Sequence, residues 1–579
     1  MKKININNDL IKYVINIIKD SSFILLLFIT LTIVISSLLF FMKISITNWN
    51  IILALISTII ISFKFLKDKK SAFISLLLTL GIIILAVFIC KHTYDLSYDG
   101  NTYHKLAIGL LNDGYNPVYD SIASFIKNNG SSVNLQVKDS IWVEHYPKAS
   151  WIFAANFYKF TGNIESAKII VMLMIYITFG ISLGFLYKKI HYIYAFLISL
   201  FISINPISIV QVFTNYVDGL MGLLIYIILI SLIVISKKKD RVDLEFKNYL
   251  LILGCSIIIC LNLKFTGLVY AGMYSIAFFV LWMYDAYKKN KLKDLFKKWM
   301  IYYGTVLLVA LLIVGYSPYI KNTVYKHNPL YPLIGEDKVD IMTSNSPKSF
   351  PTRNPIDKFF TSMYAKPANY KSNTSDKDPE LRIPFKTNKE EIELYKSPDL
   401  RISGFGVFFS GIFTISIIVI IFYLIKMYKL KDYENIKYIL AFIIVSFILI
   451  LITDGSWWAR YSPYVYLLPI LAMYLLLKDK KIYSKIIFLI VMLLLLFNNG
   501  TIFYTSVKLY KDNYININQS LIKMKKISNK KGFVEIALRE PIFSSQLYNF
   551  KDKNIIVKIK SNKKDLKNPV YVNYFYYNK

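Results

Sequence analysis

Two aspartates, Asp95 and Asp99, lie four residues apart directly after an apolar run that ends near Cys90. On a helix, this spacing places both carboxylates on one face. A carboxylate at a membrane edge can act as a general base that draws a proton from an attacking hydroxyl. Asp99 is the first candidate for this role and Asp95 the second. The competing interpretation is that Asp99 caps the N-terminus of a following helix.

The same segment carries further groups that could bind an anion or a metal. His104 follows Asp99, and Glu144, His145 and Lys148 lie further along the chain. His145 and Lys148 precede an aromatic segment that we expect to lie along the membrane surface, near lipid phosphates, or simply to anchor the chain there. Glu144, His145 and one of the aspartates could instead hold a divalent metal, because carboxylates suit Mg²⁺ or Mn²⁺ and histidine suits Zn²⁺.

Three more charged residues, Asp218, Lys264 and Arg460, stand at the ends of apolar runs. An ionisable group at the boundary of lipid is either solvated or functional. Lys264 and Arg460 could stabilise negative charge on a departing phosphate, and arginine offers a planar fork to its oxygens. Tyr461 follows Arg460 and is also a candidate substrate-binding residue. The alternative for both cations is snorkelling towards water.

The composition defines the class of protein that must position these residues. The chain has 579 residues, of which 55% are hydrophobic, and a mean hydropathy of +0.45. These values indicate a mostly helical, polytopic membrane protein. The net charge of +33 does not point to nucleic acid, because much of the lysine lies in short loops between apolar runs, where it determines topology. The basic N-terminus runs into an apolar segment without a cleavage site, which predicts a retained anchor.

We predict about 13 membrane-spanning helices from the length of the apolar runs. They lie near Ser22–Met42, Trp49–Phe63, Ala72–Cys90, Ile169–Tyr187, Tyr192–Val212, Gly219–Ile235, Tyr249–Leu263, Gly267–Tyr284, Met300–Tyr316, Gly404–Ile425, Tyr438–Ile452, Tyr461–Leu477 and Ile486–Phe503.

Lysine in the connecting loops predicts the orientation of these spans. If the N-terminus is inside, every inner loop is rich in lysine, whereas the short outer connections at 43–48, 214–218 and 453–460 are poor in positive charge. This is the positive-inside pattern. Two long loops, 91–167 and 318–403, and the C-terminus then lie outside. The middle of the second loop is polar and rich in Pro, Asn and Lys, which suggests a cover over a binding site.

The expected domains are a pair of N-terminal helices (1–71), a membrane core (72–503) and a small outer α+β domain (504–579). Residues 532–538 and 554–560 alternate like strands, and Ile517–Ile527 could form a helix. The fold class is therefore an all-α polytopic membrane protein with an α+β C-terminal domain. This basic domain could hold an anionic polymer or an acceptor.

Several short motifs together resemble those of the multispanning GT-C glycosyltransferases, which use polyprenyl-phosphate-linked sugars. They are Tyr98-Asp-Gly-Asn-Thr-Tyr-His104 in the first outer loop, Asp218 at an outer helix end, Lys264-Phe-Thr-Gly, Asn328-Pro-Leu-Tyr-Pro and Arg460-Tyr-Ser-Pro. The resemblance implies an eleven-helix core that begins at the third span, with an outer C-terminal domain. The two spans before that core depart from the superfamily pattern.

The resemblance further implies an inverting glycosyltransferase of a bacterial cytoplasmic membrane. Asp99 would act as base, and a sugar would pass from a polyprenyl-phosphate donor to an envelope glycan, lipid or protein on the outer face. Lys264, Arg460 and either His145 or Lys148 would hold the phosphate. The rivals are an envelope glycan polymerase or ligase and a transporter or flippase of lipid-linked glycans. A transporter would need ionisable groups in mid-span, whereas the candidates here gather at span ends.

Overall fold

The computed structural model describes residues 2–129, 140–238, 242–370 and 378–579. Within these ranges, eleven helices are long and apolar enough to cross a membrane. The chain is therefore a multi-pass membrane protein. The helices are α1 (Lys2–Phe41), α2 (Asn48–Phe65), α3 (Lys69–Lys91), α8 (Ile170–Leu186) with the preceding 3₁₀ turn η2 (Ile164–Ile169), α11 (Asp218–Lys238), α12 (Leu244–Leu261), α13 (Phe265–Lys288), α14 (Leu292–Leu307) with its π-helical continuation η3 (Leu308–Val314), α18 (Phe409–Lys429), α19 (Tyr433–Ile452) and α21 (Ile482–Lys531).

Two of the thirteen predicted spans are interrupted, so the predicted count is not confirmed. The first divides into α9 (Tyr192–Ser203) and α10 (Pro206–Gln211), and the Asn205 side chain caps α10. The second begins with a 3₁₀ turn, η8 (Pro463–Tyr466), and continues as the short helix α20 (Leu467–Lys478). Each interruption coincides with a proline, which has no N–H to donate within a helix.

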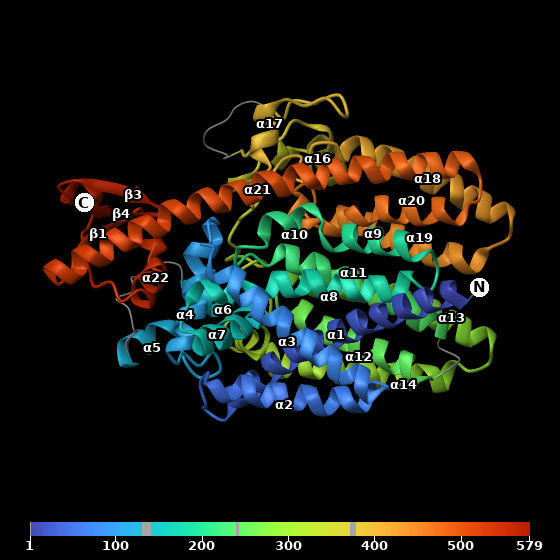
Figure 1. The fold of residues 1–579 in the computed structure, drawn as a ribbon, viewed down its shortest axis with the longest axis horizontal. Helices are drawn as coiled ribbons and strands as arrows, with labels where there is room; N and C mark the ends of the chain where they lie inside the picture. Colours follow the sequence, from blue (N-terminus) through green and yellow to red (C-terminus); the bar gives the residue numbers. More distant parts are fainter. Residues whose placement is uncertain (1, 130–139, 239–241, 371–377) are drawn as a thin grey trace.

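The bundle has two ends of different character (Figure 1). The C-terminal sheet lies at one end, which we call the sheet end. The lysine-rich loops between α2 and α3, α13 and α14, α18 and α19, and α20 and α21 lie at the other, which we call the lysine end. The predicted inner loops therefore gather on one side of the bundle.

Helix α1 belongs to the centre of the bundle. It packs against α2, α3, α8 and α12, and 72% of its apolar window is buried, against 22% for α2 and 28% for α3. Helix α1, the first of the predicted pair of N-terminal helices (1–71), therefore packs inside the bundle, where most of its apolar residues contact protein.

The first long loop folds into a π-helical turn and four short helices: η1 (Gly100–His104), α4 (Lys105–Asp113), α5 (Ile122–Asn129), α6 (Ser140–His145) and α7 (Ala149–Thr161). Gly114 ends α4 in a left-handed conformation. The prediction that the aromatic segment lies along the membrane surface is wrong. Trp151 is 1% exposed in α7, because the helix packs between α4, η2 (Ile164–Ile169) and α1.

The second long loop folds on the outside of the bundle, and Figure 1 shows its α16 and α17 above α21, between the sheet and α18. It contains η4 (Tyr316–Lys321), α15 (Asn322–Lys326), α16 (Pro355–Tyr364) and α17 (Lys389–Leu394), with 3₁₀ turns η5 (Thr343–Asn345) and η6 (Phe350–Thr352). Helix α16 packs on α18 and α19. Part of this loop therefore rests on the bundle.

The last span and the C-terminal domain are one continuous element. Helix α21 has 50 residues and is about 75 Å long at 1.5 Å per residue. This is more than twice the thickness of a bilayer core. The predicted boundary at residue 504 therefore falls within α21, and the predicted helix at 517–527 is part of the same helix. Figure 1 shows α21 running from the lysine end to the sheet.

A four-stranded sheet follows α21, in the order β2-β1-β4-β3. The strands are β1 (Val534–Leu538), β2 (Val557–Ile559), β3 (Pro569–Val572) and β4 (Phe575–Asn578), and β1 pairs with β2 in parallel. Helix α22 (Gln546–Asp552) joins these two strands. The two predicted strands are confirmed, and the α+β character of the terminus follows from the βαβ unit.

Candidate functional site

Five charged side chains meet at the sheet end, and we call them the charge cluster. Asp99 directly precedes η1, Asp218 is the first residue of α11, and Lys264 directly precedes α13. Arg460 lies in the 3₁₀ turn η7 (Ala459–Tyr461), and Asp399 lies in the loop before α18. Four of these residues were predicted from sequence. The ends of five segments distant in sequence therefore converge on one place.

Arg460 is the centre of the cluster. Its Nη1 atom lies 3.2 Å from Asp399 Oδ1, 3.5 Å from Asp218 Oδ2 and 3.7 Å from Asp99 Oδ2. Lys264 Nζ lies 2.7 Å from Asp218 Oδ1. One guanidinium thus holds three carboxylates, and without it their mutual repulsion would separate them.

Aromatic rings surround the two cations. The Arg460 guanidinium lies 4.0 Å from the centroid of the Trp458 ring and 5.3 Å from that of Tyr216. Lys264 Nζ lies 3.7 Å from the centroid of Tyr461, which is 6% exposed. Tyr461, a predicted substrate-binding residue, therefore holds Lys264 by a cation–π contact. Arg460 Nε is buried without a hydrogen-bond partner, so this side chain keeps a spare donor.

Asp99 is the carboxylate that the structure leaves most available. Its backbone is helical and its side chain makes no capping hydrogen bond, so the interpretation as a helix cap is wrong. The side chain is 27% exposed. Burial of the carboxyl group, the largest cause, and the charges of Asp399 and Asp218 raise the pKa of Asp99 to about 6, although the Arg460 cation opposes this change. Such a group can exchange protons near neutral pH.

Asp95, the second predicted base, is fully buried and has a full set of partners. Its Oδ1 accepts from the Ser97 N–H and hydroxyl at 2.8 and 2.5 Å, and its Oδ2 accepts from the Asn215 N–H and side-chain amide at 2.8 Å each. It lies outside any helix, in the irregular segment before η1, so the predicted shared helix face with Asp99 is wrong. Asp95 instead ties this loop to the start of α11.

His104 is buried at the edge of the cluster. Its Nδ1 accepts a hydrogen bond from Trp151 Nε1 at 2.6 Å, and its ring centroid lies 6.3 Å from that of Tyr216. Burial lowers the pKa of His104 to about 3. The imidazole is therefore neutral near pH 7, and its predicted contact with a phosphate could involve only a neutral hydrogen bond.

His145 and Lys148 serve the first loop rather than the charge cluster. His145 Nδ1 lies 2.7 Å from Asn322 Oδ1, and Lys148 Nζ donates to the carbonyls of Glu144 and Tyr146. Burial lowers the pKa of Lys148 to about 7. Among the described residues, no hydrogen bond or ion pair joins His145 or Lys148 to Arg460 or its carboxylates.

A metal centre was the second predicted use of these residues. The described part of the chain contains no group of three or more His, Cys, Asp or Glu side chains placed to hold a metal ion. Asp95, His145 and Glu144 have the separate surroundings given above. The dependence on Mg²⁺ or Mn²⁺ stays a prediction, and no chemical step below relies on it.

Sequence reasoning missed Asp399 and Arg401, which lie in Ser397-Pro-Asp-Leu-Arg401. Arg401 Nη2 lies 3.7 Å from Asp399 Oδ2, and its guanidinium lies 5.3 Å from the Trp458 ring centroid. The signal was a pair of opposite charges directly before the Gly404-Phe-Gly406 motif, where the second long loop enters the bundle. With Arg401 included, three cations balance three carboxylates.

A small pocket of mixed polarity reaches Arg460. One side is lined by Ile207 and Val210 of α10 and Ile502 of α21. The other side comes from the loops, through Ser397, Pro398, Leu400 and Trp458 among others. The pocket therefore joins an apolar wall to the positive charge of the cluster.

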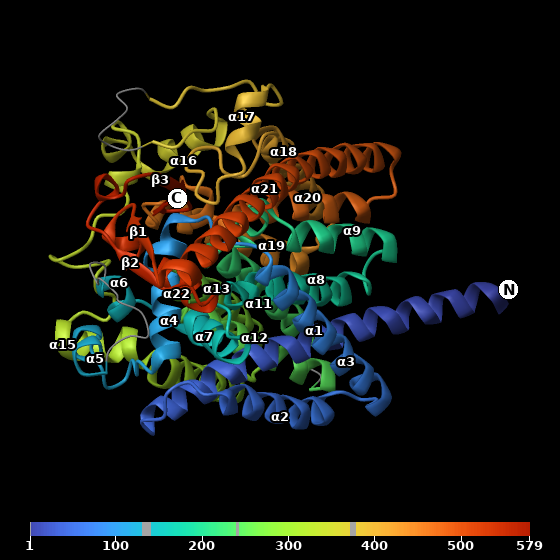
Figure 2. The same ribbon diagram turned by 60° about the vertical axis from the view of Figure 1, so that its left-hand side comes forward.

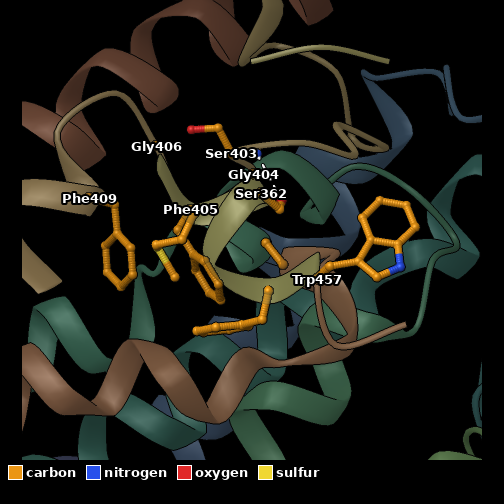
Figure 3. A pocket seen from close by; sticks show the side chains of 10 residues that line it. Ser362, Ser403, Gly404, Phe405, Gly406, Phe409 and Trp457 are labelled. Carbon is orange, nitrogen blue, oxygen red and sulfur yellow. Dashed lines mark hydrogen bonds between the residues drawn. The ribbon is translucent and has the colours of Figure 1, made fainter. Parts of the chain in front are cut away.

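A second pocket lies next to the first, and Gly404 lines both. Figure 3 shows the aromatic rings of Phe405, Phe409 and Trp457 around it, with Ser362 and Ser403 at its rim. The rings of Phe405 and Phe409 stack at 4.7 Å. Gly404 has no side chain to widen the wall between the pockets, and a Cβ there would meet Ala459 Cβ at 2.9 Å.

No protein-family model, curated protein or solved structure matches this chain. The resemblance to GT-C glycosyltransferases therefore rests on the sequence motifs, and the chemistry must be argued from the site.

Gly100 permits the close turn beside Asp99. A Cβ at this position would lie 2.2 Å from both Asp95 Oδ2 and Ser97 Oγ. We expect Gly100→Ala to lower the free energy of unfolding by about 2 kcal/mol, because these buried atoms have no room to move. Thermal unfolding in detergent would measure the loss. Gly81→Ala on α3, where no atom lies within 4 Å of the new Cβ, is the control, and equal unfolding of both variants would contradict the expectation.

Proposed function

We propose that the protein is an inverting glycosyltransferase that moves a sugar from a polyprenyl-phosphate carrier to an acceptor hydroxyl on the outer face of a bacterial cytoplasmic membrane. One observation carries this proposal: a partly exposed carboxylate, Asp99, lies 3.7 Å from a buried arginine that retains a free donor. A base and an anion-binding group thus lie side by side at the end of an apolar bundle.

The reaction is a single displacement. Asp99 takes the proton of the acceptor hydroxyl, and that oxygen attacks the anomeric carbon of the sugar from the face opposite the phosphate. The bond between the anomeric carbon and the phosphate oxygen breaks, and its electron pair stays on the phosphate. Arg460 and Lys264 stabilise the charge that develops there. One displacement of this kind inverts the anomeric configuration.

Two features support a lipid-linked donor. Arg460 lines a small pocket together with Ile207 and Val210 of α10 and Ile502 of α21, so this cation meets the apolar bundle where a phosphate with a hydrocarbon chain would arrive. The lysine-rich loops lie at the opposite end of the bundle, so the positive-inside rule favours a charge cluster that faces outwards. An outward site needs a donor that can cross the membrane, and a lipid carrier satisfies this need.

The test is sugar transfer by the purified protein in lipid vesicles. Polyprenyl-phosphate sugars with a radiolabel are supplied with envelope acceptors, and nucleotide sugars serve as the comparison. We expect label to pass from the lipid to the acceptor one sugar at a time. Transfer of a preformed glycan would favour the polymerase or ligase alternative. Movement of intact lipid-linked sugar across the vesicle, without transfer, would favour the transporter and overturn the proposal.

The pH dependence of transfer follows from Asp99. Its base form is half populated at pH about 6, because its pKa is raised to about 6. The rate should therefore fall as the pH decreases through 6 and be about tenfold lower at pH 5 than on the plateau. Initial rates between pH 4.5 and 8 would measure this. A flat profile over that range, with the chemical step limiting, would exclude Asp99 as the base.

A further inference from the structure

The C-terminal domain contacts the backbone on the N-terminal side of Asp99. The Tyr574 hydroxyl donates to the Leu96 carbonyl at 2.9 Å, and the Asn573 side chain donates to the Asp95 carbonyl at 3.4 Å. These partners are 478 residues apart in sequence. The sheet at the end of the chain therefore holds the loop that leads into Asp99.

The same domain also contacts the C-terminal side of Asp99, through the start of α22. The Ser545 hydroxyl donates to the Asn101 carbonyl at 2.5 Å, and Gln546 Nε2 donates to Asn101 Oδ1 at 2.6 Å. Asn101 is fully buried, and its own amide donates to the carbonyls of Asp95 and Ser97. Asn101 thus links the start of α22 to both flanks of Asp99.

A buried ion network fastens this junction. Glu165 accepts from Lys105 at 2.7 Å and from Lys168 at 2.6 Å, and all three side chains are at most 3% exposed. Asn549 of α22 donates to Glu165 Oε1 at 2.8 Å and accepts from Lys105 at 3.2 Å. Polar groups that are buried and fully paired specify a single geometry strongly. Figures 1 and 2 both show α22 beside α4, on the same side of the bundle.

The connection back to the membrane is rigid. Helix α21 continues without interruption from Ile482 to Lys531 and then leads into β1. A continuous helix transmits position, unlike a flexible linker. The C-terminal domain is therefore held against the first loop both by its own contacts and by the helix that carries it.

We propose that the C-terminal domain is a clamp on the Asp99 loop, in which Ser545 and Gln546 are positioning residues that hold the Asp99 carboxylate against Arg460. This goes beyond the sequence-based expectation, in which the domain binds an acceptor or an anionic polymer. The catalytic consequence rests on the proposed glycosyltransferase function. The clamping itself does not rest on that function, so an experiment can contradict the clamp and the glycosyltransferase function independently.

The first experiment measures the clamp without any substrate. The Ser545→Ala/Gln546→Met variant removes both donors to Asn101 while keeping most of the side-chain volume. We expect amide hydrogen exchange of residues 96–104 to accelerate at least tenfold, with little change in the spans. Lys553→Met, directly after the same helix, is the matched control. If the double variant unfolds, Ser545→Ala alone carries the test. Unchanged exchange in a folded variant would overturn the clamp.

The second experiment measures transfer against pH. Asp99 faces Arg460, Lys264, Asp399, Asp218, Tyr103 and Tyr216. Release of the loop should increase its contact with water. The midpoint of the acid limb should then move from about 6 towards the ordinary aspartate value of about 3.9, and the plateau rate should fall about tenfold. Loss of folded protein would lower rates equally at every pH. Faster exchange with an unmoved midpoint would overturn the positioning of Asp99, whereas a wild type inactive with every carrier would overturn the proposed function alone.

Discussion

Asp99→Asn should reduce sugar transfer by about 10²- to 10⁴-fold, which is the usual contribution of a positioned general base. The substitution keeps the shape of the side chain and removes its basicity. Folding should be preserved, because the side chain is 27% exposed and lies 3.7 Å from its ionic partner, Arg460, and makes no capping hydrogen bond. The measurement is the single-turnover rate at pH 7.5, together with the melting temperature.

Asp95→Asn is the matched comparison. We expect it to lower the stability of the protein and to leave the transfer rate largely unchanged. Asparagine would turn an amide N–H₂ towards the donors of Ser97 or Asn215, which now reach a carboxylate. Because hydrogen bonds to charged groups are strong, we expect a loss of about 3 kcal/mol in stability. Any protein that folds should keep most of its single-turnover rate. If Asp95→Asn folds but transfers no sugar while Asp99→Asn stays active, Asp95 is the base and Asp99 is the structural carboxylate.

Much of the site could be predicted from sequence because the ends of spans are predictable. Asp218, Lys264 and Arg460 each stand where an apolar run stops, and alternate spans bring such ends to the same side of a bundle. Asp99 follows the same logic after α3. The structure brings all four together. Hydropathy therefore located the residues, although it said nothing of the distances between them.

The rest depended on contacts between distant segments, which no local pattern encodes. Asp399 reaches Arg460 from a polar loop, whereas the composition of this loop predicts only a cover over the site. Asp95 acquired its role from Asn215, which is 120 residues away. His145 found its partner in Asn322. Polar residues in loops carry little periodicity, so their partners emerge only when the chain is folded.

Two of the predicted spans form shorter helices than expected, for a different reason. Hydropathy averages over a window and treats a proline as one residue among many, whereas the backbone loses a hydrogen bond at that point. Asn205 and Pro206 therefore interrupt one predicted span, and Pro463 another. The interruption at Pro463 lies three residues after Arg460, so the same irregular backbone that breaks the span presents the arginine to the carboxylates.

Arg460→Gln should have the largest combined effect of any single substitution in the site. It removes the cation that holds Asp99, Asp218 and Asp399 together and leaves only Lys264 bonded to Asp218. We expect the free energy of unfolding to fall by about 3 kcal/mol at pH 7.5. This is the lower end of the loss expected when one partner of a buried ion pair is removed, because Asp99 and Asp399 are about a quarter exposed. Transfer should fall at least about 100-fold, since the phosphate loses its arginine donor. Arg460→Lys should keep most of the stability, but lysine cannot offer the phosphate the two parallel donors that a guanidinium provides.

The pH dependence of Arg460→Gln separates electrostatics from lost packing. The pKa values of Asp99 and Asp399 are already raised by burial while Arg460 is present, and removing this cation must raise them further. A carboxyl group with a higher pKa in the folded state takes up protons on folding, so stability increases as the pH falls through that pKa. The melting temperature of Arg460→Gln should therefore recover towards the wild-type value between pH 7.5 and 5. An equal deficit at both pH values would mean that Arg460 stabilises the site by packing on Trp458 rather than by its charge.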